Sequence, residues 1–415
     1  MRRLTDADYP LVVLALILSV FGVATVYSAG QTDVSTALAG LWRMQSLYLA
    51  LGLGAAWLVS RTSVRALDYV TPAIYGITLV LLVYVLIFGG GRGTAKSTHS
   101  WIYIGNVSIG QPAELAKISV VLMLAKVLSG RGEAPKTLFD LWKPAAVVGA
   151  PWVLIMLQPD LGTGLVFVAI FFAMLYWAGT PWQLVVMAAS PVVSLALAFS
   201  TSLWGAWFVL IIVLLYRTKP FLLDSVIVVA ANLVFGVVAP VVWENLKPHQ
   251  RQRLLVYLDP SSDPLKGGYH VLQSQVAIGS GGWFGKGFTQ GSQKRLAFLP
   301  EQHTDFIFPV LAEEIGFLGV VVALALFAWL MMRCIRIAAR SQNPYSSLVA
   351  FGLVAMLFAH VIENVGMTIG VMPVAGIPLP FFSYGGSFML ACWVAVGLLV
   401  RLSLEGRGRA DTLVI

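Results

Sequence analysis

Long apolar stretches recur along the whole chain and are separated by short polar segments. A helix that crosses the hydrocarbon core of a bilayer needs about 20 mostly apolar residues, whereas a membrane β-barrel shows alternating segments of about 10 residues. The pattern therefore predicts an all-α fold, a polytopic membrane bundle forming a single domain over 1–415. Twelve spans are expected, at 9–29, 45–60, 69–89, 111–129, 143–158, 162–179, 183–200, 203–217, 222–244, 306–332, 345–371 and 382–401.

Composition and charge agree with a membrane protein and indicate its orientation. Hydrophobic residues make up 58% of the chain and charged residues 11%, against about 25% charged residues in soluble domains. Cytoplasmic loops carry an excess of Lys and Arg, so the spans fit best with both termini in the cytoplasm. The cationic residues on the cytoplasmic side are then Arg2, Arg3, Arg61, Arg65, Lys126, Arg131, Lys136, Lys143, Arg217, Lys219, Arg333, Arg336, Arg340, Arg401, Arg407 and Arg409.

The short outer loops hold only Arg43, Arg92 and Lys96, which makes the charge asymmetry consistent for all twelve spans. Part of the net charge of +8 is therefore an orientation signal. Since no basic patch with interleaved aromatic residues is present, we expect no nucleic-acid partner.

One connection, 246–305, is much longer than the others and lies on the outer side in this topology. Long loops in compact proteins usually serve a function. Its segment 269–278 is apolar enough to form a short or re-entrant helix at the membrane surface. Its many glycines lack the spacing of a phosphate-binding loop, so we expect them to serve tight turns. A shorter outer segment, 90–110, carries aromatic residues suited to the membrane interface.

Ionisable residues inside expected spans are costly and are candidates for function. In GQPAELAK, Glu114 falls in the first turn of a helix that begins at a proline, where it suits the helix dipole. Lys117 lies three residues further on the same face and can pair with Glu114. In LQPDLGTG, Asp160 has the position of an N-cap. Helix capping, the helix dipole and ion pairing are sufficient to explain each of these residues. The alternative is that they line a polar cavity.

Two further sets of polar residues fall in the last third of the chain. Glu313 and Glu314 are adjacent, so their side chains point about 100° apart and cannot easily share one partner. His360 and Glu363 lie one turn apart in the next expected helix. Together these four residues could suggest a metal, but the Glu-x-x-His pair of di-iron bundles is absent. Polar pairing between helices is the better interpretation.

Several motifs together resemble the SEDS family, the bacterial glycosyltransferases of rod shape and division. The matching segments are LDPSSDPLKGGYHVLQSQVAIGSGGWFGKG, GSQKRLAFLPEQHTDFIFPVLAEEIG and NVGMTIGVMPVAGIPLPFFSYGGS, together with GQPAELAK and QPDLGT. They follow the order of the family from about residue 100 to 390. The forms EQHTDFIF and MPVAGIPLPFFSYGGS are more similar to the elongation branch (RodA-like) than to the division branch (FtsW-like).

The resemblance implies a peptidoglycan glycosyltransferase that polymerises lipid II on the outer face of the cytoplasmic membrane. It also implies a class B penicillin-binding protein as the partner that crosslinks the product. The essential carboxylate of the family corresponds to Asp263 in the large outer loop, whereas Asp259 belongs to a less general motif upstream. The cavity residues of the family correspond to Glu114, Lys117 and Asp160.

The implied reaction needs a base for the attacking sugar hydroxyl and cations for the departing pyrophosphate. Transfer with inversion in one displacement requires a single base, which would be Asp263. Without the resemblance, Asp263 in Ser-Ser-Asp-Pro also fits ordinary turn chemistry. Candidate partners of the pyrophosphate are Lys117, Arg251, Arg253, Lys286 and Lys294. The loop cations among these are equally explained as a solvated surface that faces anionic lipid.

Four residues near the outer ends of late spans complete the candidate site. His303 and Thr304 precede a span and could line the cavity, while Asp305 is better explained as the cap of that span. Ser383, in the FFSYGGS motif, is a further cavity candidate. A divalent cation such as Mg²⁺ or Mn²⁺ is compatible with acids near a pyrophosphate, although the sequence contains no dedicated ligand cluster.

Members of the family typically have ten spans, and the two additional spans expected here fall among 183–244. Because the addition is a pair, the loop 246–305 stays outside. Two other functions remain open. A lipid II flippase would also have many spans and intramembrane charges, and a scaffold for the penicillin-binding protein would need no activity of its own.

Overall fold

The structure, a computed structural model, describes residues 8–33, 38–91, 100–105, 107–198, 200–245, 251, 267–299 and 301–407. Each expected span coincides with a helix in these ranges. These helices are α1 (Tyr9–Ala29), α2 (Leu41–Ser60), α3 (Val64–Phe88), α4 (Pro112–Ser129), α5 (Trp142–Leu157), α6 (Leu161–Trp177), α7 (Trp182–Leu197), α8 (Thr201–Thr218), α9 (Leu222–Asn245), α13 (Ile307–Arg340), α14 (Pro344–Ile369) and α15 (Gly386–Arg407). The all-α prediction is confirmed.

Length and hydropathy qualify eight of the described helices as membrane spans. These are α1, α3, α5 with the preceding turn η2 (Phe139–Leu141), α8, α9, α13, α14 and α15. Helix α6 and most of α7 are also apolar but shorter. The number of twelve membrane crossings therefore stays a prediction. The eight qualifying helices are enough to make the chain a multi-pass membrane protein.

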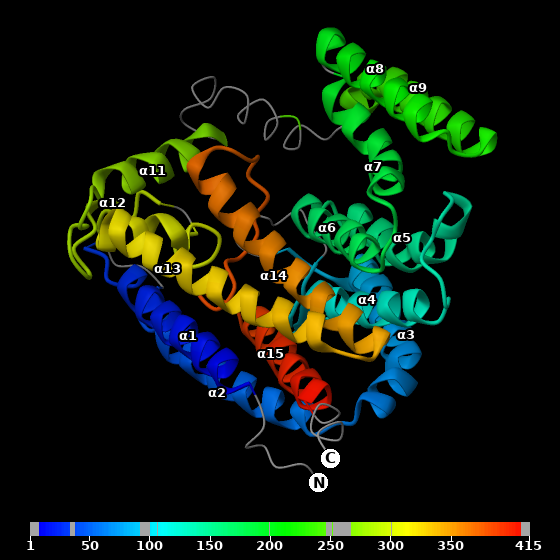
Figure 1. Ribbon diagram of the computed structural model, residues 1–415. Coiled ribbons are helices and arrows are strands. Elements are labelled where there is room, and N and C mark those ends of the chain that lie inside the picture. The colour runs from blue at the N-terminus through cyan, green and yellow to red at the C-terminus, as the bar shows by residue number, and fades with distance from the viewer. Residues whose placement is uncertain are drawn as a thin grey trace.

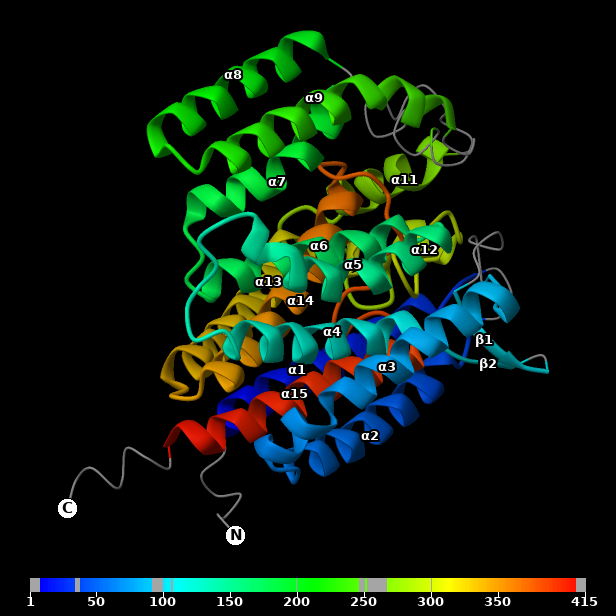
Figure 2. The same ribbon diagram turned by 90° about the vertical axis from the view of Figure 1, so that its right-hand side faces the viewer.

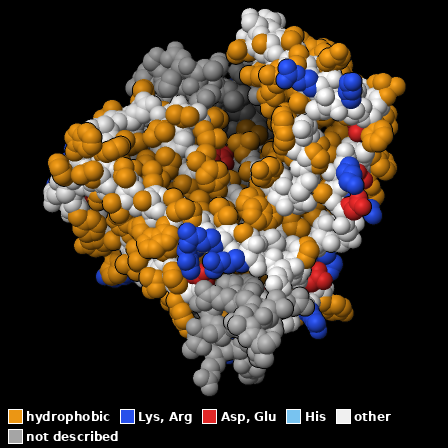
Figure 3. All heavy atoms as spheres, viewed as in Figure 1, with side chains coloured by type: hydrophobic (Ala, Val, Ile, Leu, Met, Phe, Trp, Pro, Cys, Tyr) orange, Lys and Arg blue, Asp and Glu red, His pale blue; other side chains and the backbone are white. Residues whose placement is uncertain are grey.

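The helices form one bundle whose centre is occupied by α14 and α15 (Figure 1). Helix α14 packs on α4, α6 and α13, while α15 packs on α2 and α1 packs on α13. The most apolar stretches of α14 and α15 are 72% and 78% buried, against 6% for α8. The outer surface is mainly hydrophobic (Figure 3), as expected for helices that face lipid.

The two ends of the bundle differ (Figure 2). The first turn of α1 and the last turn of α15 lie at one end. The opposite end carries α11 (Gly267–Ser280), α12 (Ser292–Arg295) and a hairpin of β1 (Ile102–Ile104) and β2 (Val107–Gly110), which pair antiparallel with Tyr103 opposite Ser108. Helix α11 confirms the helix expected at 269–278, whereas the hairpin was not expected.

Helices α7, α8 and α9 project from the bundle (Figure 1) and have a small hydrophobic core of their own. This core includes Met187, Ile211 and Val228. Buried polar bonds also connect α7 to α9: the Asn232 amide donates to Ser190 Oγ at 2.7 Å and accepts from Ser194 Oγ at 2.5 Å. The surface is hollowed beside this unit, and an acidic side chain lies at the edge of the hollow (Figure 3).

The last helix begins four residues later than expected, at Gly386 instead of 382. The preceding residues 380–383 form a turn that is held by bonds within the segment and by one bond to Thr304. Phe381 has a positive φ of 65°, and Ser383 Oγ accepts from the Leu379 amide at 2.8 Å and donates to the Thr304 carbonyl at 2.6 Å. Apolar composition alone did not reveal this interruption.

The glycine-rich segment after α11 forms tight turns, as expected, and also packs against α13. Gly282, Gly285 and Gly287 all have positive φ. Helix α13 is interrupted at Gly316, where φ is 67° and ψ is −172°. The segment bonds to this interruption on both sides, since the Phe317 amide donates to the Gly282 carbonyl at 2.8 Å and the Lys286 amide donates to the Glu313 carbonyl at 3.0 Å.

Candidate active site

A buried cluster of charged residues joins α4 to α14. Gln111 is the N-cap of α4 and Glu114 lies in the first turn, as expected. Lys117 Nζ lies 2.8 Å from Glu114 Oε2, which confirms the expected pair. It also lies 2.7 Å from His360 Nε2 on α14. Lys117 and His360 are each 1% exposed, so the ammonium group is enclosed by protein.

His360 is fixed on its other side by the backbone and by an aromatic ring. Its Nδ1 atom lies 3.1 Å from the Pro378 carbonyl oxygen. Its ring centroid lies 4.8 Å from that of Phe388, and Lys117 Nζ lies 5.6 Å from the centroid of the same ring. The interpretation of His360 as a polar partner between helices is therefore confirmed, with Lys117 as the partner.

Asp160 caps α6 and also contacts the start of α4. Its Oδ1 accepts from the Thr163 amide at 3.0 Å, which confirms the expected N-cap. Its Oδ2 accepts from Gln111 Nε2 at 3.1 Å. Asp160 is half-buried, so it lies at the border between the buried cluster and the surface.

Glu363 is a further buried acid of this region, on α14. It is 3% exposed, and its Oε1 has no hydrogen-bond partner among the residues that the structure describes. It lies within electrostatic range of Lys117 and Asp160. The cluster thus combines a lysine with three carboxylates, those of Glu114, Asp160 and Glu363.

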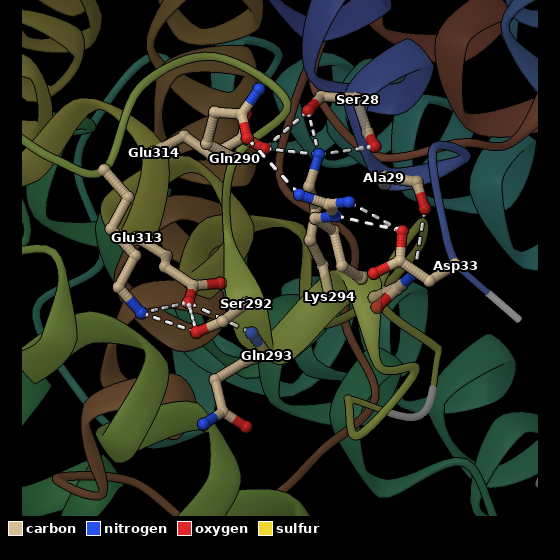
Figure 4. A network of polar contacts seen from close by, with 12 residues as sticks. Ser28, Ala29, Asp33, Gln290, Ser292, Gln293, Lys294, Glu313 and Glu314 are labelled. Atoms are coloured by element: carbon tan, nitrogen blue, oxygen red, sulfur yellow. Dashed lines mark hydrogen bonds and ion pairs between the residues drawn. The ribbon is translucent and has the colours of Figure 1, made fainter.

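A second network surrounds the two acids of α13 (Figure 4). Lys286 Nζ lies 2.7 Å from Glu313 Oε1, and Lys294 Nζ lies 2.5 Å from Glu314 Oε1. Ser28 Oγ on α1 also donates to Glu314 Oε1 at 2.5 Å. The prediction that the two acids take different partners is confirmed.

Lys294 does not have the position expected of a pyrophosphate partner or of a solvated surface lysine. Its side chain is 0% exposed, and its ammonium group bonds to Ser28 and Glu314. Burial lowers the pKa of Lys294, although the neighbouring Glu314 acts in the opposite direction. The residue anchors α12 to α1 and α13. Lys286 keeps 30% of its side chain exposed and stays a candidate.

The residues before α13 and before α15 hold each other in place. The Ser383 side chain is used in the bonds described above, and the Tyr384 amide donates to the His303 carbonyl at 2.8 Å. Thr304 Oγ1 donates to the Glu301 carbonyl at 3.2 Å. The expected cap by Asp305 is wrong, because the N-cap of α13 is Phe306 and no side chain bonds there.

Two of the predicted residues, Asp263 and Arg253, lie outside the described residues. Arg251 is described and donates to the carbonyl of Glu244 at the end of α9. In the described part of the chain, no group of three or more His, Cys, Asp or Glu side chains is arranged to hold a metal ion. The contact between Lys117 and His360 was not expected, although each was known to need a partner inside the bundle.

Comparison with known proteins identifies the chain's relatives. The family model described as "Cell cycle protein" (FtsW/RodA/SpoVE) matches residues 9–206 and 199–408. The peptidoglycan glycosyltransferase MrdB of Escherichia coli K12 is 34% identical over 396 residues, which cover 95% of this chain and 93% of MrdB. The peptidoglycan glycosyltransferase RodA of Treponema pallidum is 34% identical over 432 residues, covering 97% and 98% of the two chains.

A solved structure has the same fold. It comes from work on the structural coordination of polymerization and crosslinking by a peptidoglycan synthase complex. It is 31% identical, has a TM-score of 0.70, and covers 97% of this chain and 99% of its own. The chain therefore belongs to the FtsW/RodA/SpoVE family, named SEDS above, and is a RodA-like member of it.

Proposed function

We propose that the chain is a peptidoglycan glycosyltransferase that polymerises lipid II at the outer face of the cytoplasmic membrane, in cell elongation and shape maintenance. The observation that carries the proposal is the enclosed Lys117 of α4 in a chain whose relatives are named peptidoglycan glycosyltransferases. A buried ammonium group among membrane helices suits the pyrophosphate that links a sugar to a lipid.

The proposed chemistry divides two tasks between separate parts of the chain. Asp263 would take the proton from the attacking sugar hydroxyl as the new glycosidic bond forms. Lys117 would offset the charge that develops on the pyrophosphate as the bond to the anomeric carbon breaks. One displacement inverts the anomeric centre and needs no second carboxylate as nucleophile. The support for Asp263 is the family motif in which it stands.

The proposed location follows from the two different ends of the bundle. The loop that carries Asp263 continues into α11, at the end of the bundle that also carries the hairpin before α4. The bias of Lys and Arg assigns this end to the outer side and both termini to the cytoplasm. Lipid II and membrane lipids would approach from the surrounding bilayer.

We also propose a class B penicillin-binding protein as the partner. The support is the solved structure of similar fold, from work on coordinated polymerization and crosslinking.

The unit of α7–α9 occupies the region where two additional helices are expected. The two matches to the family model also meet in this region, at residues 199–206.

The deciding experiment supplies lipid II to the purified protein, with and without the partner and with and without Mg²⁺ or Mn²⁺. Glycan strands of increasing length on a gel would support the proposal. If no condition yields polymer, while lipid II crosses vesicles that contain the protein, the chain is a flippase. If neither occurs but the partner gains activity from the complex, the chain is a scaffold.

A further inference from the structure

The ammonium group of Lys117 has three N–H bonds and two polar partners among the described residues. Glu114 Oε2 lies 2.8 Å from the nitrogen as an ion pair, and His360 Nε2 accepts a hydrogen bond at 2.7 Å. No third acceptor for Lys117 is found among the residues that the structure describes. The ring of Phe388, which lies 5.6 Å away, attracts the cation but offers no directed bond of comparable strength.

The contacts of His360 determine where its proton is. An ammonium group only donates, so His360 Nε2 must accept. The remaining proton is then on Nδ1, where it can be donated to the Pro378 carbonyl at 3.1 Å. His360 is therefore the neutral tautomer with hydrogen on Nδ1. Protonation of Nε2 would remove the acceptor and place a second positive charge beside Lys117.

The surroundings explain why the lysine needs this acceptor. Glu363 follows His360 by one turn of α14, is 3% exposed and has an Oε1 atom with no hydrogen-bond partner among the described residues. It attracts Lys117. Glu114 lies on the same helix as Lys117, and the bond to His360 on α14 adds a fixed partner from a second helix.

We propose that His360 is a positioning residue for the transfer reaction. By accepting from Lys117, it restrains the ammonium group so that the third N–H bond is directed at an oxygen of the substrate's pyrophosphate. This inference rests on the proposed function. His360 itself exchanges no proton with the substrate and stays neutral throughout.

The test compares two replacements of His360 that separate hydrogen bonding from packing. His360→Gln retains an acceptor oxygen, whereas His360→Phe retains a ring that can pack on Phe388 but accepts nothing. We expect kcat/KM for lipid II polymerisation to fall about 10- to 100-fold for His360→Phe, because small misplacements of a reacting group have effects of this size. His360→Gln should remain close to the wild type.

A second comparison links the effect to the lysine. In a Lys117→Met background, His360→Phe should cause no further loss, since residues that act together are not additive. Thr368→Val serves as a control on α14, because Thr368 is buried and bonds within its own helix at Val365. If His360→Phe does not fold, His360→Leu takes its place as the apolar variant.

Equal activity of the apolar variant and the wild type would overturn the inference and leave the proposed function intact. Greater activity of the Phe variant than of the Gln variant would also overturn it, because packing would then be the role of the ring. A wild-type protein that yields no polymer with its partner would instead contradict the proposed function itself.

Discussion

Glu313 and Glu314 are consecutive residues of α13, yet each binds a different lysine of the loop that follows α11. Glu313 contacts Lys286 at 2.7 Å, and Glu314 contacts Lys294 at 2.5 Å. The first pair is partly exposed through its lysine, whereas the second is closed to solvent. The two pairs therefore fix one loop at two points of the same helical turn, and loss of a single partner should cost more at the second point.

Removal of one partner of the closed pair should destabilise the protein strongly. Glu314→Gln leaves the Lys294 charge buried without a carboxylate, and loss of one partner of a buried pair costs about 3–5 kcal/mol. Thermal unfolding in detergent measures the effect. Glu314→Leu combined with Lys294→Met should recover most of the loss, since no buried charge then remains. A Glu314→Gln variant as stable as the wild type would contradict the prediction.

Asp263→Asn should abolish polymerisation of lipid II without changing membrane insertion or binding to the partner. Loss of a general base lowers rates by about 10²- to 10⁴-fold. Quantitative gel analysis of glycan strands provides the measurement. Asp259→Asn is the matched control from the neighbouring Asp-Pro pair and should keep its activity. Polymer near the wild-type amount from Asp263→Asn would remove this residue from the catalytic role.

Lys117→Met should reduce polymerisation by about 10²- to 10³-fold, the range found when a single charge-stabilising donor is lost. The variant removes a cation but also leaves Glu114 buried without its partner, so its folding must be checked. Lys117→Met with Glu114→Gln removes both charges and should be more stable but equally inactive. Recovery of activity in the double variant would show that Lys117 serves folding alone.

Asn232→Leu should destabilise the α7–α9 unit by about 0.6–2 kcal/mol, the range of hydrogen bonds between membrane helices. The Asn232 amide bonds to both Ser190 and Ser194 on α7 and is fully buried. Protease accessibility of this unit and the polymerisation rate are measured together. We expect protease accessibility to rise and the polymerisation rate to change little, because the α7–α9 unit has a hydrophobic core of its own.

Gly316→Ala should disrupt the packing of the glycine-rich segment after α11 against α13 and so destabilise the protein. A Cβ atom at this position would lie 2.2 Å from the Gly285 amide nitrogen, at a φ of 67° that side chains rarely adopt. The strain alone costs roughly 1–2 kcal/mol, and the clash adds to it. Gly149→Ala in α5 meets no atom within 4 Å and is the control. An unchanged melting temperature for Gly316→Ala would contradict this account.

The positions of the helices could be predicted from the sequence because lipid requires long apolar segments with all backbone groups bonded internally. Even the short span at 203–217 corresponds to α8. The sequence places the start of α15 too early because residues 382–385 are mostly apolar or small, while the turn before the helix depends on a distant carbonyl, that of Thr304. Local composition contains no information on such a bond.

The candidate site could be predicted only in part. Glu114 and Lys117 are three residues apart, so the helical repeat was sufficient to pair them. His360 is 243 positions from Lys117, and the sequence contained several intramembrane residues that could have been its partner. Lys294 was misjudged for a similar reason, because a lysine in a polar loop is usually solvated and its burial depends on two distant helices.

The bond from Lys294 to Ser28 spans 266 positions, and this distance has a consequence for biosynthesis. Helix α1 emerges from the ribosome early, but the groups that complete its C-terminal end emerge only after nearly three hundred residues. The early helices must therefore be in the bilayer before Ser28 can bind its final partners, Lys294 and Glu314. Final assembly of this end is a late event, and mutations of Glu314 or Lys294 should expose newly made chains to quality-control proteases.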